Sequence, residues 1–286
     1  MATREGLYQA LDRFRDALGD NAPARVEWAP GVRYTENNVT LDPGDGLWNT
    51  VTAIGPYDLR FADASHGQVA LFTCVEETDA VSPCAIRLAF RDGVIEQCEI
   101  VVARNKDEGF PFLGAAFADK PAMLADVPAA ERISREEMIA LANGYFETIE
   151  RNNGMIRTRF HPHCNRVENG VQTTNNADFP LPIARLGCEA QFALGWYRYD
   201  DALRARRFPL VDIERGIVLA HGFIDHSGRL GDYELTDGTR VRSPIRRPHS
   251  YCLAEAFRIR DGAIEQVEAV FHTVPYRTPS PWDAAW

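Results

Sequence analysis

Apolar side chains recur every three or four residues in two stretches of the chain, and each stretch predicts an amphipathic helix. The first stretch covers residues 4–19, and its apolar face consists of Leu7, Leu11, Phe14 and Leu18. The second begins at Ser134, which Glu137 follows three residues later, a signature of a capped helix start. Its apolar face consists of Met138, Leu141, Ala142, Tyr145, Phe146 and Ile149. Each helix is expected to bury one side.

Each helix is followed by apolar stretches of strand length that turn residues separate. After the first helix these predicted strands are residues 67–76, 84–91 and 94–104. After the second helix they are residues 216–225, 251–260 and 263–274. An Arg-Asp-Gly tripeptide joins the last two strands of each series, which predicts a tight hairpin. Helices followed by a run of strands indicate the α+β class.

The two series are copies of one sequence. Residues 91–99, Arg-Asp-Gly-Val-Ile-Glu-Gln-Cys-Glu, return at 260–268 as Arg-Asp-Gly-Ala-Ile-Glu-Gln-Val-Glu. Residues 28–39 align without a gap with residues 160–171, including a proline and a glutamate at matching positions. Such repeats predict two units of one fold. We place the units at residues 1–120 and 134–286, with a linker at 121–133 that is rich in alanine and proline.

The second copy is the longer one. Between matching points, 57 residues separate Glu36 from Gly93, whereas 94 separate Glu168 from Gly262. The added residues fall into two insertions, one before and one after Asp212. The first holds the aromatic residues Phe192, Trp196, Tyr197 and Tyr199, and the second holds Arg240, Arg242, Arg246 and Arg247. Each insertion is either a lid over a cavity or a subunit contact, and the arginines also fit a solvated loop.

Composition limits the classes of partner. The chain has 286 residues, 45% of them apolar, which suffices for two ordinary cores. A net charge of −10 argues against nucleic acid, whose phosphates need a basic surface. No apolar run has the length of a membrane span or a signal peptide, so we expect a cytoplasmic protein without a membrane partner.

The sequence predicts no metal and no cofactor. Glycine-rich phosphate loops and dinucleotide fingerprints are missing. The six cysteines show no zinc spacing and are expected to be buried free thiols. His161, His163 and Cys164 are metal-binding residue types, but no further ligand completes a set.

The order of these features resembles the nuclear-transport-factor-2-like (NTF2-like) superfamily, which includes ketosteroid isomerases and SnoaL-like cyclases. The features are a helix, an aromatic residue two positions before Pro30 or Pro162, a glutamate at Glu36 or Glu168, and strands closed by Asp-Gly. The resemblance covers the whole chain. It implies two tandem cone-shaped domains, each a curved antiparallel sheet wrapped around helices.

The resemblance to ketosteroid isomerases implies site residues in the second copy. Their general base corresponds to Glu168, eight residues after Phe160. Their helix tyrosine corresponds to Tyr145, their protonated carboxylic acid to Glu255, and an aromatic residue of their pocket to Phe271. Glutamate stands at both acid positions where that family has aspartate. The first copy keeps Glu36, but Arg13 and Phe14 stand in place of the tyrosine and Ile86 in place of the acid.

A carboxyl group inside an apolar cone loses hydration, so its pKa rises and it can act as a base or a neutral donor near pH 7. Each candidate also has a structural alternative. Glu168 could flank a turn at the rim of the cone, and Tyr145 could be a core residue. Glu255 could be a buried partner of Arg166.

The long tandem form is similar to sphingomonad enzymes that remove formaldehyde from lignin-derived diarylpropane diols. That similarity implies a cofactor-independent lyase that dehydrates its substrate through a quinone methide and releases formaldehyde and a stilbene. The catalytic residues implied are Glu168, Glu255, Tyr145 and Arg166. Residues expected to bind the small aromatic substrate are Phe271, Trp196, Tyr197, Tyr34, Arg104, Lys106 and His221. Tyr199, Tyr276 and Trp282 are expected near the mouth, and His226 is a second candidate proton carrier.

Two other functions remain open. One is an isomerase or dehydratase that uses the same acid and base on a polycyclic substrate. The other is a non-catalytic binding or dimerisation module. Because the superfamily often dimerises through its sheet, we expect a homodimer. The sequence leaves open which of the two cavities is used.

Overall fold

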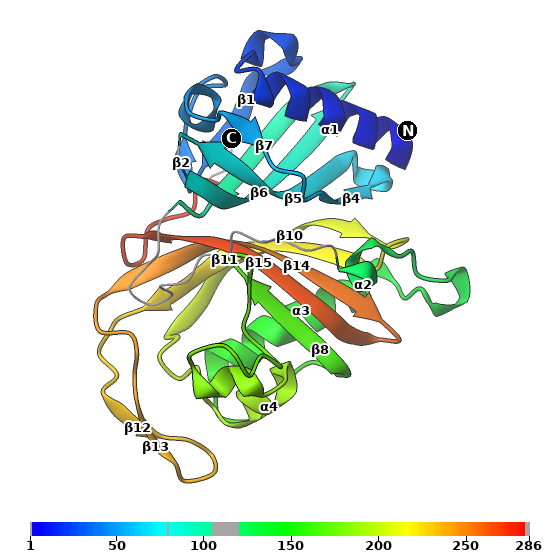
Figure 1. Cartoon of the computed structure of the whole chain (residues 1–286). Helices are drawn as coiled ribbons and strands as arrows, with labels where there is room; N and C mark the ends of the chain where they lie inside the picture. The colour runs from blue at the N-terminus through cyan, green and yellow to red at the C-terminus, as the bar shows by residue number, and fades with distance from the viewer. Residues whose placement is uncertain (1, 79, 105–119, 284–286) are drawn as a thin grey trace.

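The protein forms two lobes, each a curved sheet with a helix across one face (Figure 1). The computed structural model describes residues 2–78, 80–104 and 120–283. One sheet lies within residues 28–102 and the other within residues 160–274, on either side of the proposed linker. The class is α+β, with few helices and two large sheets.

Among its described residues, the first lobe has seven strands and one long helix, α1 (Arg4–Gly19). The strands are β1 (Trp28–Glu36), β2 (Val39–Thr40), β3 (Ala53–Ile54), β4 (Leu59–Asp63), β5 (Gln68–Glu77), β6 (Ala80–Arg91) and β7 (Val94–Val102). Their order is β2-β1-β7-β6-β5-β3, and β4 pairs with β5. Thr3 caps α1, because its Oγ1 accepts a hydrogen bond from the Gly6 amide at 3.1 Å.

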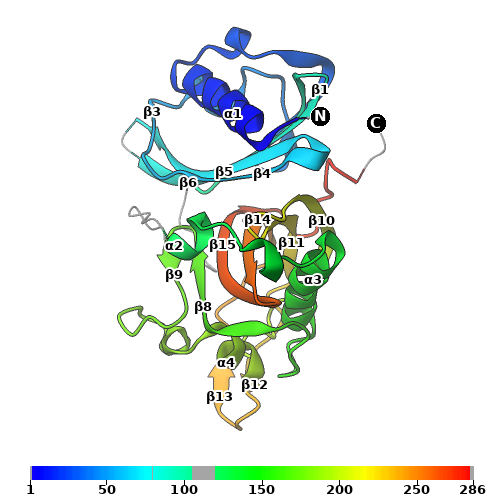
Figure 2. The same ribbon diagram turned by 90° about the vertical axis from the view of Figure 1, so that its right-hand side faces the viewer.

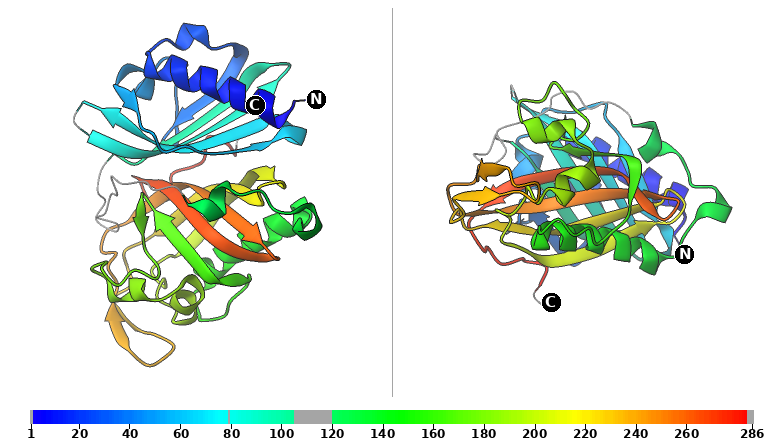
Figure 3. Two further views of the ribbon diagram at one scale, coloured as in Figure 1. Left: turned by 45° about the vertical axis from the view of Figure 1, so that its right-hand side comes forward. Right: turned by 90° about the horizontal axis from the view of Figure 1, so that it is seen from below.

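The second lobe repeats this plan around α3 (Arg135–Arg151). Its strands are β8 (Phe160–Glu168), β9 (Val171–Gln172), β10 (Ala202–Asp212), β11 (Ile217–His226), β14 (His249–Arg260) and β15 (Ala263–Val274), in the order β10-β11-β14-β15-β8-β9. Short α2 (Pro121–Leu124) lies in the linker. The first insertion contains α4 (Cys188–Ala193), and the second contains β12 (Asp232–Glu234) and β13 (Arg240–Arg242). The β12–β13 hairpin projects away from the first lobe (Figure 3).

Local signals in the sequence are confirmed. Ser134 and Glu137 form the expected capping box, with a hydrogen bond in each direction. The two Arg-Asp-Gly turns have positive φ at both central residues, 52° and 86° at Asp92 and Gly93 and 51° and 66° at Asp261 and Gly262. These angles belong to type I′ hairpins, whose twist matches that of the strands.

The sheets are mixed, so the expectation of antiparallel sheets was wrong for one strand pair in each. β1 pairs with β7 in parallel, and β8 pairs with β15 in parallel. Parallel neighbours need a long connection, here almost the whole unit. A sequence pattern gives the direction of strands that a short turn joins, but it says little about strands so far apart in the chain.

The two sheets pack against each other through the faces turned away from their helices (Figure 2). An apolar cluster with residues from both sheets fills this interface, including Phe61, Phe72, Leu219, Ala256 and Val270. Polar contacts repeat with near symmetry. The Ala62 amide donates to Asp212 at 2.9 Å, and the Val211 amide donates to Asp63 at 3.2 Å. The two lobes therefore pack together within one chain through equivalent faces of their sheets.

Candidate functional site

The second lobe encloses a cavity of about 400 Å³. The concave face of its sheet, helix α3 and both insertions form the walls. The insertions contribute Phe179, Leu181, Ile183, Ala184, Phe192, Trp196, Tyr197, Tyr199, Asp200, Arg242, Pro244 and Ile245. Residues of both insertions thus line the cavity, a position compatible with a lid. The volume falls in the range of pockets that hold small organic ligands.

Two glutamates lie in one row across the sheet floor. Glu168 at the end of β8 is level with Ala269 on β15, and Ala269 is level with Glu255 on β14. Adjacent strands lie about 4.8 Å apart, so roughly 10 Å separates the two glutamate backbones. All three residues line the cavity. The small side chain of Ala269 leaves open space between the two carboxyl groups.

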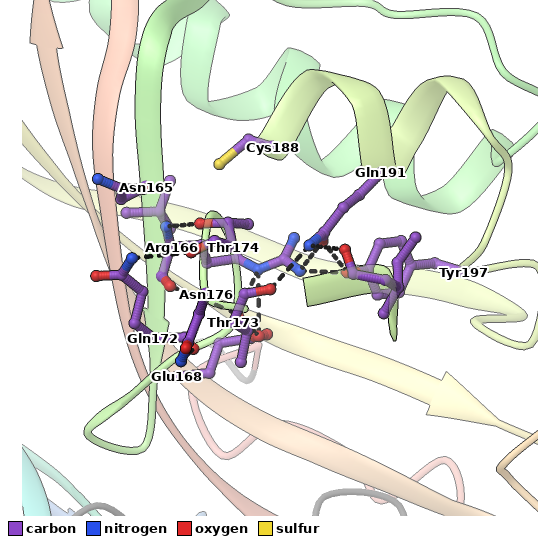
Figure 4. Close-up of polar contacts among 12 residues, drawn as sticks. Asn165, Arg166, Glu168, Gln172, Thr173, Thr174, Asn176, Cys188, Gln191 and Tyr197 are labelled. Carbon is purple, nitrogen blue, oxygen red and sulfur yellow. Dashed lines mark hydrogen bonds and ion pairs between the residues drawn. The ribbon is translucent and has the colours of Figure 1, made fainter. Parts of the chain in front are cut away.

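Arg166 holds the Glu168 side of the row in place (Figure 4). Its Nε donates to Glu168 Oε2 and to Thr173 Oγ1, both at 3.2 Å. Its Nη2 donates to Gln191 Oε1 at 2.7 Å and to the Tyr197 hydroxyl. Burial alone would lower the pKa of Arg166, but Glu168 and neighbouring groups raise it well above its usual value, so the guanidinium stays charged.

The Glu168 carboxylate keeps one oxygen open for a ligand. Oε2 accepts the bond from Arg166 and another from Thr173 Oγ1 at 2.5 Å. None of the residues that the structure describes donates to Oε1. The side chain is 23% exposed, in contact with the cavity.

Glu255 is a buried acid that stays protonated near neutral pH. It is 5% exposed. Burial is the largest cause that raises its pKa, to about 8, and the charge of Glu168 adds to the effect, while Arg166 and a hydrogen bond with Tyr145 oppose it. Burial likewise raises the pKa of Tyr145 well above its usual value, so this side chain stays a neutral phenol. Two neutral O–H groups therefore lie opposite one carboxylate.

Seven of the residues expected at the site from the sequence line this cavity: Glu168, Glu255, Tyr145, Arg166, Phe271, Trp196 and Tyr197. Aromatic rings make up much of its apolar wall. Tyr145 packs edge-on against Phe192 at a centroid distance of 5.2 Å, and Phe192 packs against Tyr197 at 5.4 Å.

The other expected residues lie elsewhere. Tyr34 is buried in the core of the first lobe. Arg104 forms ion pairs with Glu36 and Glu77, both at 2.6 Å. His221 belongs to the interface between the lobes, where its Nδ1 is 3.2 Å from Glu99, because it points to the opposite face of the sheet from the cavity residues. Lys106 lies outside the described residues.

Of the aromatic residues expected near the mouth, Tyr199 lines the cavity, but Tyr276 and Trp282 do not. Trp282 instead lies over the guanidinium groups of Arg33, Arg87 and Arg207, at 4.8 to 5.0 Å. The chain after β15 leaves the second sheet and runs toward the first lobe (Figure 2). Closeness to β15 in the sequence therefore did not predict where Trp282 lies.

The sequence did not single out three polar residues of the site, Thr173, Gln191 and Asp200, although it offered His226 as a candidate proton carrier. Thr173 and Gln191 position Arg166, as described above. Asp200 and His226 also line the cavity and form a buried pair, with Nε2 of the imidazole 2.9 Å from Oδ1 of the carboxylate. Thr173 corresponds to Leu41 of the first copy, which carries no polar group. Gln191 and Asp200 lie in the lengthened segment between Glu168 and Asp212, so a comparison of the copies could not reveal them.

Within the described residues, no three His, Cys, Asp or Glu side chains gather closely enough to hold a metal ion. Cys164 is instead next to Cys188, with 3.1 Å between the sulfur atoms. Among the described helices, none combines the length and the apolar character needed to cross a bilayer.

Residues 131–271, most of the second lobe, match the family model described as "Domain of unknown function (DUF8021)". No curated protein matches the chain. Among solved structures, the chain is similar to a "putative ketosteroid isomerase" from Kribbella flavida DSM 17836, with 15% identity over 45% of this chain and 95% of that one, and a TM-score of 0.31. It is also similar to a protein of unknown function with a cystatin-like fold from Methylobium petroleophilum PM1, with 14% identity over 42% and 96% of the chains and a TM-score of 0.30.

Proposed function

We propose that the second lobe is an NTF2-like enzyme that performs cofactor-independent acid–base chemistry on an aromatic substrate. The observation that carries this proposal is the pair formed by Glu255 and Glu168. A carboxylic acid with a pKa of about 8 shares a cavity with a carboxylate that an arginine holds in place. Acid and base are thus available together near neutral pH, which is what paired proton transfer requires.

The geometry suggests a role for each residue. Glu168 Oε1 is the base, because its partner oxygen is already bound by Arg166 and Thr173. Glu255 and Tyr145 are donors to an oxygen that gains negative charge. A donor aimed at such an oxygen contributes about 3 kcal/mol to transition-state stabilisation in well-studied enzymes. Arg166 keeps the charge of Glu168 oriented.

The walls favour a flat, largely apolar molecule. Phe192, Trp196, Tyr199 and Phe271 line the space with rings, and aliphatic side chains such as Ile183 and Leu253 fill the gaps between them. Rings stack on such walls with offset or edge-on geometry. A two-ring phenylpropanoid is of a suitable size and polarity.

In its specific form, the proposal is a lyase that acts on a diarylpropane diol. With the ring hydroxyl of the substrate ionised to a phenolate, Glu255 gives its proton to the benzylic hydroxyl. The carbon–oxygen bond breaks, water departs, and the phenolate ring becomes a quinone methide. Glu168 then takes the proton of the terminal hydroxyl. The carbon–carbon bond to that carbinol carbon breaks, formaldehyde leaves, and the electron pair restores the aromatic ring of a stilbene.

Formaldehyde release from a diaryl diol tests this reaction. Glu168→Gln should abolish release while far-UV circular dichroism stays unchanged. Glu189→Gln is a matched control, because Glu189 is an exposed residue of α4 that does not line the cavity. Turnover near that of the wild type in Glu168→Gln would remove Glu168 as the base.

The same pair of acids also suits an isomerase or dehydratase, which would convert a polycyclic ketone or alcohol without releasing a one-carbon product. Product analysis separates the two reactions. If neither substrate is converted and Glu255→Ala changes only stability or partner affinity, the lobe is a binding module.

A further inference from the structure

A second polar group lies in the cavity, apart from the two glutamates. Asp200, near the end of the first insertion, and His226, the last residue of β11, both line the cavity and are 7% and 2% exposed. Their side chains form the 2.9 Å contact between Oδ1 and Nε2. A buried aspartate beside histidine is an arrangement that orients an imidazole for proton transfer.

The pair lies at the far end of the sheet from Glu255. On β11, His226 is level with His249 of β14, whereas Ala220 is level with Glu255. Six residues of strand separate these two rows, or about 20 Å at roughly 3.3 Å per residue. Tyr251, Leu253 and Glu255 line the cavity at every second position of β14 and connect the two ends.

The chemistry of the pair leaves one nitrogen for a ligand. A carboxylate only accepts hydrogen bonds, so Asp200 fixes the proton of the imidazole on Nε2. Nδ1 then carries the lone pair. In the described part of the chain, Nδ1 is buried without any hydrogen-bond partner. A buried acceptor left in this state is unfavourable, and a ligand hydroxyl would satisfy it.

The surroundings are suited to an aromatic ring. The imidazole of His226 is 4.8 Å from the Tyr251 ring, 4.6 Å from the His249 ring and 6.3 Å from the Tyr199 ring, measured between centroids. Arg242 of the second insertion lines the same cavity and brings a positive charge to it.

We propose that Asp200 and His226 form a binding site for a phenolic hydroxyl. The substrate class is then an aromatic compound whose terminal ring carries a free hydroxyl group. The phenol O–H bond breaks, an N–H bond forms at Nδ1, and the imidazolium stays paired with Asp200 beside the phenolate. This deepens the proposed function and rests on it, because the site would anchor the far phenol ring of an elongated aromatic substrate whose reacting carbons lie near Glu168 and Glu255.

Binding of two flat probes, 4-hydroxystilbene and 4-methoxystilbene, tests the site without turnover. The wild type should bind the hydroxyl compound about tenfold more tightly, the effect of one added hydrogen bond. His226→Phe should bind both probes with equal affinity. His249→Gln is the matched control, since His249 stacks on His226 but does not line the cavity, and it should keep the preference.

A tenfold preference that survives in His226→Phe would overturn the phenol site. A failure of the proposed reaction would give a different result. In that case Glu168→Gln would still release formaldehyde, while the wild type would keep its preference for the hydroxyl probe. If the wild type binds neither probe, the aromatic cavity itself is refuted, and both proposals fail together.

Discussion

Ile86 and Glu255 occupy the same position in the two copies of the fold. Ile86 is level with Ile100 and, through it, with Glu36, just as Glu255 is level with Ala269 and with Glu168. In the first lobe the isoleucines belong to the apolar core. In the second lobe an acid and an alanine take their places, and this exchange opens a cavity with an acid inside it.

The first prediction concerns the pH dependence of activity. The pKa of Glu255 is raised to about 8, so the side chain is protonated below that pH and loses its proton above it. If Glu255 is the acid, kcat should fall as the pH rises through about 8. Glu255→Gln should lower kcat by about 10²–10⁴-fold and remove this limb of the profile. If kcat of the variant still falls as the pH rises through about 8, another group causes that fall.

The same shift predicts how stability depends on pH. A carboxyl group whose pKa is higher in the folded state stabilises that state below its unfolded pKa, and the contribution is lost as the pH rises through the folded value. Urea unfolding of the wild type should therefore show decreasing stability through about pH 8. Glu255→Gln should lack this decrease. A parallel decrease in both proteins would contradict the burial of an ionisable Glu255.

Arg166 should be a strong determinant of stability as well as activity. It is 2% exposed and bonds to Glu168, Thr173, Gln191 and Tyr197. Arg166→Met leaves a charge and several polar groups without a partner, which should cost about 3–5 kcal/mol in the free energy of unfolding. Adding Glu168→Gln to that variant should recover part of the loss, as a double-mutant cycle in urea would show. Simple additivity would mean that the pair is not coupled.

The interface between the lobes should be sensitive to acid. Burial would raise the pKa of Glu99, but His221, Arg207 and Arg87 lower it to about 2. Burial lowers the pKa of His221 to about 3, against the opposing effect of Glu99. The stability from Glu99 is present above its unfolded pKa and is lost as the pH falls toward 2, and that from His221 is lost below about 6.5. In the double variant Glu99→Gln/His221→Leu, the free energy of unfolding should therefore fall less steeply as the pH is lowered, which urea unfolding at several acidic pH values would measure.

The two lobes should depend on each other. Their sheets bury a common apolar cluster, so a fragment of residues 120–286 would expose half of it. Exposed apolar faces of this kind associate. The fragment should dimerise or aggregate in light scattering, whereas a monomeric fragment would contradict the role of the cluster. A homodimer of the full chain, still a prediction, would need another surface.

Much of the fold could be read from the sequence, because the signals were local. The cap at Ser134, the turns at Asp92 and Asp261 and the alternation along β14 and β15 each depend on neighbouring residues. Glu168 and Glu255 were implied as site residues by the resemblance to ketosteroid isomerases, and both line the cavity. The sequence offered His226 as a candidate proton carrier, but its pairing with Asp200 could not be predicted, because the pair joins an insertion to the end of a strand.

Direct observation of the Glu255 carboxyl group would test the central claim, that a neutral acid and a carboxylate share the cavity of the second lobe. In carbon-13 NMR of protein labelled at the glutamate carboxyl carbon, Glu255→Gln identifies the resonance by its loss. We expect that resonance to indicate a protonated acid at pH 7 and to titrate near pH 8. Titration of the same resonance near the ordinary glutamate value of about 4.3 would contradict the account.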